Sequence, residues 1–256
     1  MTRLRGILFD MDDTLIDWSD FHGDWRVMER RHLGAVYQFL SDAGRSLETD
    51  FETFNERYGN RVRDAWMEAR NSLRAPHLGF LLMETLREYG FVPDARIDER
   101  ACLEAYQWGP VDGVTVFPDT PALLEDLQAR GIKVGIVTNA FQPMWLREAE
   151  LVAYDLLRYF PERQALLSAA DVGYLKPHRA IFRRALECLG TTAEETLFIG
   201  DNPVADIAGS QAAGMRAILR VKTPPAMLLS GLIVPDSAIN TFEELPALLA
   251  DWFPGW

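Results

Sequence analysis

This chain has few cysteines and few lysines, and its net charge is negative. Only two of its 256 residues are cysteines, Cys102 and Cys188, and neither has the spacing of a metal-binding motif. The sequence has no apolar run of transmembrane length, and it leaves no room for a signal peptide before its first motif. Together with two thiols that suit a reducing compartment, these absences predict a cytoplasmic protein.

The formal net charge is -12, from 38 acidic and 26 basic residues. Such an excess of negative charge argues against nucleic acid or an anionic membrane as a main partner. It does not exclude a small phosphate ester, because a metal ion and one or two cations can bind such an ester locally. Three of the basic residues are lysines, Lys133, Lys176 and Lys222, so the position of each lysine is informative.

Most of the chain alternates short apolar runs with amphipathic helical patterns. The apolar runs are continuous, as in strands that are buried on both faces of a parallel sheet. Strands are expected at 7–9, 132–138, 165–168, 196–200 and 215–221, and helices at 120–130, 143–159, 178–189, 203–213 and 241–252. This order predicts an α/β fold with a Rossmann-like, doubly wound parallel sheet.

A purely helical stretch interrupts this alternation directly after the first strand. Helical patterns are expected there at 25–40, 51–73 and 78–89. We therefore predict an α/β catalytic core from residues 1–16 and 113–256, with an inserted all-helical cap domain at 17–112. Ligands of such sheets bind beyond the carboxyl ends of the strands, so the cap would cover the site. Cap residues that could reach a substrate are Trp18, Phe21, Trp25, Arg57 and Arg61.

The strongest chemical signal is an acidic cluster at the end of the first strand. Asp10 and Asp12 lie two residues apart and leave the sheet in the same general direction. Like charges at this separation raise each other's pKa unless a cation lies between them. A divalent metal would stabilise both, and an all-oxygen site favours Mg²⁺. The alternative explanation is a solvated acidic turn.

Polar residues also follow the later strands, at Thr138 and Asn139, at Lys176, and at Asp201 and Asp206. Each has an ordinary explanation when taken alone. Thr138 could cap a strand end, Lys176 could be a solvated loop residue, and the two aspartates could stabilise a helix N-terminus. Together and in this order, they predict one site at the carboxyl edge of the sheet.

These four motifs resemble those of the haloacid dehalogenase (HAD) superfamily of phosphotransferases. The matching stretches are 10–15, 137–139, 175–178 and 200–207. The resemblance extends over about residues 1–16 and 113–250 and is weak within the cap. It implies a Mg²⁺-dependent phosphatase that hydrolyses a small phosphorylated metabolite, a phosphomonoester, through an aspartyl-phosphate intermediate.

The resemblance also implies a role for each acidic residue. Asp10 would be the nucleophile, and Asp12 would protonate the leaving oxygen and then activate water. Mg²⁺ would be held by the Asp10 carboxylate, the Asp12 backbone carbonyl and Asp201. Asp206 would be a ligand through water or a partner of Lys176.

Phosphate binding would fall to the remaining motif residues. Lys176 and the metal would neutralise the approach of an anionic phosphate to an anionic nucleophile. Thr138 and the backbone N–H of Asn139 would bind the oxygens of the transferred phosphoryl group.

Three other functions fit parts of the pattern. Dehalogenases of the superfamily lack the second aspartate, because a halide needs no proton, so the presence of Asp12 argues against dehalogenation. Phosphomutases keep Asp12 and place a histidine near His22, but they carry a small hydroxyl residue where this chain has Trp18. A catalytically idle regulatory homologue would be expected to have lost a motif residue, and all are retained. The sequence leaves open whether the protein is a monomer or a homodimer.

Overall fold

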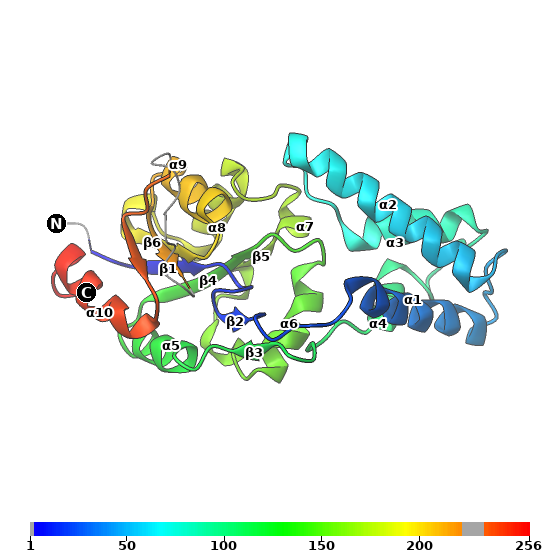
Figure 1. The fold of residues 1–256 in the computed structure, drawn as a ribbon, viewed down its shortest axis with the longest axis horizontal. Coiled ribbons are helices and arrows are strands. Elements are labelled where there is room, and N and C mark those ends of the chain that lie inside the picture. The colour runs from blue at the N-terminus through cyan, green and yellow to red at the C-terminus, as the bar shows by residue number, and fades with distance from the viewer. Residues whose placement is uncertain (1–2, 222–232) are drawn as a thin grey trace.

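Six parallel strands form the central sheet, in the order β5-β4-β1-β6-β7-β8 (Figure 1). The computed structural model describes residues 3–221 and 233–256. The strands are β1 (Gly6–Phe9), β4 (Lys133–Thr138), β5 (Leu166–Ser168), β6 (Thr196–Gly200), β7 (Arg216–Arg220) and β8 (Ser237–Ile239). β1 lies in the middle, and every residue of it is buried. The predicted Rossmann-like parallel sheet is confirmed.

Helices cover both faces of this sheet. They are α5 (Thr120–Ala129), α6 (Met144–Ala153), α8 (Arg179–Leu189) and α10 (Leu245–Trp252). Successive side chains of a strand point to opposite faces, and the apolar contacts of β1 separate in this way. Ile7 and Phe9 pack in one cluster with residues of α5, α6 and α10, whereas Leu8 packs in another with residues of α8. The continuous apolar run in β1 therefore reflects a sheet covered on both sides.

Some elements differ from the predicted ones. The helix expected to reach residue 159 ends at Ala153, and Asp155 adopts a left-handed conformation with φ 55°. Such a conformation does not continue a right-handed helix. The helix expected at 203–213 begins with a π-helical turn, η4, and continues as α9. The short elements are η1 (Leu157–Tyr159), η2 (Arg163–Ala165), α7 (Ala169–Val172), η3 (Ala193–Glu195), η4 (Pro203–Ala208), α9 (Gly209–Ala212) and η6 (Phe242–Glu244).

Four helices follow β1 in the chain and lie to one side of the sheet (Figure 1). They are α1 (Trp25–Asp42), α2 (Phe51–Ser72), α3 (Leu78–Glu88) and α4 (Glu99–Tyr106), and we call them the helical insertion. Asp24, Asp50 and Asp98 cap α1, α2 and α4 by accepting backbone hydrogen bonds. The helices share an apolar cluster that includes Phe54 and Tyr58. An inserted helical unit is therefore present, of which α4 was not predicted.

The limits predicted for the core and cap domains, 1–16 with 113–256 and 17–112, stay predictions. Residues 222–232 of the predicted core lie outside the described residues. Within the described part of the chain, no helix combines the length and the apolar character needed to cross a membrane.

Two short strands connect the sheet to the helical insertion. β2 (Ile16–Asp17) and β3 (Thr115–Val116) pair in antiparallel fashion, with Ile16 opposite Val116 and Asp17 opposite Thr115. The chain therefore enters and leaves the insertion through two adjacent segments. We call this pair of strands the hinge ribbon.

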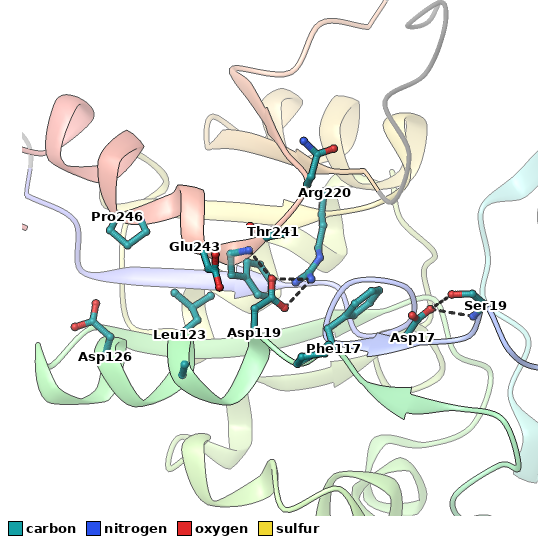
Figure 2. Close-up of a pocket in the computed structure, with 14 residues that line it drawn as sticks. Asp17, Ser19, Phe117, Asp119, Leu123, Asp126, Arg220, Thr241, Glu243 and Pro246 are labelled. Carbon is teal, nitrogen blue, oxygen red and sulfur yellow. Dashed lines mark hydrogen bonds and ion pairs between the residues drawn. The ribbon is translucent and has the colours of Figure 1, made fainter.

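A buried ion pair lies next to the hinge ribbon. Arg220, at the end of β7, donates from Nη2 to the two carboxylate oxygens of Asp119 at 2.8 and 3.0 Å (Figure 2). Its guanidinium group lies over the rings of Phe117 and Phe242, 4.1 and 3.8 Å from their centroids. Asp17 of β2 lines the cavity of about 720 Å³ beside this ion pair. The contacts connect Phe117, just after β3, to the sheet and stabilise the base of the ribbon.

Candidate active site

The carboxyl ends of three neighbouring strands gather the predicted site residues. Asp10 follows β1, Thr138 ends β4 and Asp201 follows β6, and these strands are adjacent in the sheet. Lys176 reaches the same place from the loop before α8. A cavity of about 290 Å³ is lined by all seven residues named from the sequence: Asp10, Asp12, Thr138, Asn139, Lys176, Asp201 and Asp206. We call it the acidic cavity.

A buried lysine lies between two carboxylates of this cavity. Nζ of Lys176 is 2.5 Å from Oδ1 of Asp10 and 2.7 Å from Oδ1 of Asp206. Burial alone would lower the pKa of Lys176, but the two carboxylates outweigh it and raise the pKa above its usual value. Lys176 therefore carries its charge at neutral pH. Of the two roles open for Asp206, a direct partner of Lys176 is the one that this geometry shows.

The charged form of Asp10 is disfavoured by its surroundings. Burial raises the pKa of Asp10 well above its usual value; Lys176 opposes this shift, and the nearby charges of Asp206, Asp12 and Asp201 add to it. A nucleophilic carboxylate has to be ionised. Further positive charge at this point would therefore stabilise the reactive form of Asp10.

Three carboxylates of the cavity could hold a metal ion. One oxygen from each of Asp10, Asp201 and Asp206 lies within 4.8 Å of the others. Lys176 contributes a single positive charge against these three negative charges, so the group keeps a negative excess. Hard oxygen ligands with excess negative charge suit Mg²⁺. The Asp12 carboxylate does not belong to this group, so any ligand from Asp12 would be its backbone carbonyl.

Metal binding is expected to depend on the ionisation of Asp201. Burial, together with the charges of Asp206 and Asp13, raises the pKa of Asp201 to about 6. Mg²⁺ binds the deprotonated form, so protons compete with it below that pH. Saturating Mg²⁺ is expected to raise the melting temperature by about 5 °C at about pH 7.5, and by less than about 2 °C at about pH 5.

Thermal unfolding with Mg²⁺ or with EDTA measures these shifts. Asp201→Asn serves as the control, and its Mg²⁺ shift should be small at both pH values. Equal shifts of the wild-type protein at the two pH values would contradict the predicted role of Asp201.

Three side chains donate hydrogen bonds to the Asp12 carboxylate. Nε1 of Trp18 and Nη2 of Arg147 donate to Oδ1 at 2.9 and 2.8 Å. Oγ1 of Thr138 and Nη1 of Arg147 donate to Oδ2 at 3.3 and 3.2 Å. Burial raises the pKa of Asp12, but Arg147 and the hydrogen bonds outweigh it, so the pKa is lowered. Asp12 is therefore ionised and held in one orientation.

Arg147 is not among the residues that the sequence motifs predicted. Its side chain is 3% exposed, and Nε also donates to Glu150, which accepts a hydrogen bond from Nε1 of Trp108 at 2.7 Å. A signal was present in the sequence, because Arg147 falls three residues after Met144 and four before Leu151. Both of these neighbours are buried, so Arg147 lies on the apolar face of α6. A charge on such a face indicates a buried partner.

Asn139 holds the lysine loop against the end of β4. Its Oδ1 accepts a hydrogen bond from the backbone N–H of Lys176 at 2.7 Å, and its Nδ2 donates to the Lys176 carbonyl at 3.1 Å. The role predicted for Asn139 uses its backbone N–H instead. Phosphate binding by Asn139 and positioning of Lys176 are therefore compatible.

A second cavity of about 430 Å³ adjoins the acidic cavity. The two cavities share the lining residues Asp12, Asp13, Asn139 and Ala140. The second is lined by six aromatic side chains, Trp18, Phe21, Trp25, Trp66, Trp108 and Phe141. We call it the aromatic pocket. Three of the cap candidates, Trp18, Phe21 and Trp25, therefore line a cavity next to the acidic cavity.

The two arginines named as cap candidates lie elsewhere. Nε of Arg57 and Nη2 of Arg61 donate to Glu88 of α3 at 2.9 and 2.6 Å. Neither arginine lines the acidic cavity or the aromatic pocket. The structure therefore gives no support to the expectation that they reach a substrate, and ion pairing between α2 and α3 accounts for them. His22 is exposed, as expected of an ordinary surface histidine.

Known proteins share this combination of fold and motifs. A model of the haloacid dehalogenase-like hydrolase family matches residues 4–214. The chain is 28% identical over 261 residues to a phosphoserine phosphatase of Thermus thermophilus. This match covers 94% of this chain and 98% of that protein. It is also 28% identical over 243 residues to a glyceraldehyde 3-phosphate phosphatase of Methanocaldococcus jannaschii. This match covers 94% of this chain and 95% of that protein.

Solved structures agree with the sequence comparisons. A 2-haloacid dehalogenase from Pseudomonas syringae pv. Tomato superimposes with a TM-score of 0.61 at 26% identity, over 97% of this chain and 99% of the other. A HAD phosphatase from Thermococcus onnurineus superimposes with a TM-score of 0.59 at 25% identity, over 96% of this chain and 98% of the other. Since the family model spans most of the sequence, this chain belongs to the haloacid dehalogenase-like hydrolases.

Proposed function

We propose that this hydrolase is a Mg²⁺-dependent phosphatase that cleaves a small phosphomonoester through an aspartyl-phosphate intermediate. The observation that carries the proposal is the buried contact of Asp10 with Lys176, in one cavity with Asp201 and Asp206. This arrangement gives a carboxylate nucleophile the positive charge that it needs to meet an anionic phosphate. The relatives named as phosphatases of phosphoserine and of glyceraldehyde 3-phosphate support a small phosphate ester as the substrate.

In the first half of the reaction, a carboxylate oxygen of Asp10 attacks phosphorus while the ester P–O bond breaks. Asp12, which is ionised in the free protein, takes up the proton of the monoanionic ester and passes it to the leaving oxygen. Lys176, which contacts Asp10, offsets the negative charge of the phosphoryl group. Mg²⁺ held by the Asp10 carboxylate, the Asp12 backbone carbonyl and Asp201 would supply further positive charge to the phosphoryl oxygens.

In the second half, water attacks the phosphorus of the phosphorylated Asp10, and the bond between Asp10 and phosphorus breaks. Asp12 takes the proton from the water, and inorganic phosphate leaves. A base has to be ionised, and the lowered pKa of Asp12 favours this state. The hydrogen bonds from Arg147 and Thr138 orient the carboxylate for this step.

The alternatives find less support. Asp12 is present and fixed by hydrogen bonds, whereas loss of a halide needs no proton donor. The position that favours a small hydroxyl residue in mutases holds Trp18, whose indole contacts Asp12. An idle homologue does not account for a buried Lys176 between two carboxylates. Hydrolysis uses each of these groups and does not require a small hydroxyl residue at the position of Trp18.

The test is release of inorganic phosphate from a panel of phosphomonoesters, with Mg²⁺ or with EDTA. We expect Mg²⁺-dependent release from at least one ester with kcat/KM above about 10³ M⁻¹s⁻¹. Phosphorus NMR on the same samples detects transfer within the substrate, which would indicate a mutase. If no ester releases phosphate with Mg²⁺ present, the phosphatase proposal is refuted.

A further inference from the structure

The lining of the aromatic pocket includes two groups of rings that contact one another. In the first, Trp25 stacks on Trp18 with ring centroids 5.2 Å apart, and Phe21 lies 5.0 Å from Trp25. In the second, Trp66 of α2 and Phe141 of the loop after β4 meet edge to face, with centroids 6.3 Å apart. Faces and edges of aromatic rings of this kind attract a further flat ring in a stacked or edge-on arrangement.

The pocket offers little to an anionic leaving group. Among the described residues that line it, Arg147 is the single basic side chain. Its positive charge is already paired with the carboxylates of Asp12 and Glu150, so it is not available to balance a ligand carboxylate or a second phosphate. Bringing such a negative charge into this pocket without a partner would be costly. The lining therefore disfavours a negatively charged group.

Trp25 is exposed in a way that a bound ring would change. Its side chain lies at the start of α1 and is 51% exposed, although it lines the aromatic pocket. Large exposed apolar side chains that gather at a cavity mark binding surfaces. A ring that entered the pocket would remove part of this indole from water, which is favourable.

We infer that the leaving group of the substrate carries a planar aromatic ring without negative charge, and that this ring stacks in the aromatic pocket. The inference rests on the proposed function, because it takes the acidic cavity as the phosphate site. The two cavities share Asp12, Asp13, Asn139 and Ala140. The ring is therefore joined to the ester oxygen by a short connection, and an arylalkyl phosphate is the simplest probe.

The experiment compares kcat/KM for four esters with alkoxide leaving groups: 2-phenylethyl, 2-cyclohexylethyl and ethyl phosphate, and phosphoserine. The phenyl ester should exceed the cyclohexyl ester by about fivefold, because the two rings are similar in size and differ in stacking. It should exceed phosphoserine by about a hundredfold, because the carboxylate of the serine leaving group lacks a cationic partner in the pocket.

Variants locate the effect in the pocket. Trp25→Leu should lower the ratio of kcat/KM for the phenyl ester to that for ethyl phosphate by about fivefold, and Trp66→Leu should act in the same direction. Phe80→Leu is the matched control, since Phe80 is an exposed aromatic of α3 that does not line the pocket. The control variant should leave the ratio unchanged.

Failure of this inference and failure of the proposed function give different results. If ethyl phosphate is hydrolysed but the phenyl ester has no advantage, the ring inference is overturned and the phosphatase stands. If Trp25→Leu lowers the melting temperature but not the ratio, the aromatic residues only pack the helical insertion, which also overturns it. If no ester is hydrolysed, calorimetric binding of 2-phenylethylphosphonate against ethylphosphonate decides whether the pocket prefers a ring.

Discussion

Replacement of Asp10 by asparagine is expected to lower Mg²⁺-dependent phosphate release by at least about a thousandfold. The amide has nearly the same shape as the carboxylate, but it cannot form an acyl phosphate. Burial and neighbouring carboxylates raise the pKa of Asp10, so its charged form is destabilising at neutral pH. The melting temperature of metal-free Asp10→Asn should therefore equal or exceed that of the wild-type protein. Lost activity could then not be ascribed to unfolding.

Two measurements test this prediction. Steady-state phosphate release gives the activity, and rapid-quench experiments detect the phosphoenzyme. Asp126→Asn is a suitable control, because Asp126 of α5 forms an exposed pair with Arg130, the residue that follows this helix. That variant should keep full activity. Activity of Asp10→Asn within tenfold of the wild type would contradict covalent catalysis by Asp10.

Replacement of Arg147 by methionine is expected to lower the free energy of unfolding by about 3 kcal/mol at neutral pH. The change leaves the fully buried Glu150 without its cation, and burial already raises the pKa of Glu150. The side chain of Asp12 is 34% exposed, so water screens its interaction with Arg147. Loss of this second interaction therefore adds less to the destabilisation than the loss at Glu150. Urea unfolding followed by fluorescence measures the difference.

The loss of stability caused by Arg147→Met should be larger at neutral pH than at acidic pH. Arg147 holds the pKa of Asp12 below its usual value of 3.8, so this stabilisation is complete above that pH and is lost as the pH falls through the lowered value. In Arg147→Met, Asp12 and Glu150 take up protons at a higher pH than in the wild type. The stability difference between the two proteins should therefore narrow as the pH falls from about 7 to about 4.

Kinetics separate a positioning role of Arg147 from a structural one. Because Arg147 orients Asp12, kcat of Arg147→Met should fall by about a hundredfold, within the range of general acid–base catalysis. Glu150→Gln is the matched control, since it breaks the other half of the same ion-pair group and keeps the contact of Arg147 with Asp12. It should lose stability but little activity. Equal losses of kcat in the two variants would argue against positioning of Asp12.

The sheet was predictable because its central strands have a local signature. Strands β1, β4 and β6 are continuous apolar runs, and burial on both faces requires such runs. β8 and the hinge ribbon lack this signature, because they are two or three residues long and depend on pairing with distant segments. The end of α6 was misplaced because the apolar pattern continues past Asp155, where the backbone turns.

Most motif residues were predictable because they directly follow or end a parallel strand. The carboxyl ends of β1, β4 and β6 lie at one edge of the sheet, so their polar residues come together there. Arg147 was missed because it is 135 positions from Asp12 in the sequence, and nothing local links the two. Trp18 was named only for specificity, yet it also contacts Asp12. Cytoplasmic location, the absence of nucleic-acid and membrane partners, and monomer or homodimer assembly stay predictions.

The hydrogen bond from Trp18 to Asp12 has a mechanical consequence. Trp18 follows β2 directly, at the point where the chain leaves the hinge ribbon for the helical insertion. A movement of the insertion about this ribbon would carry the Trp18 indole away from Asp12 and break this hydrogen bond. Asp12 would then be fully oriented only while the insertion keeps the position seen here, so that opening the cavity would also weaken the acid–base group.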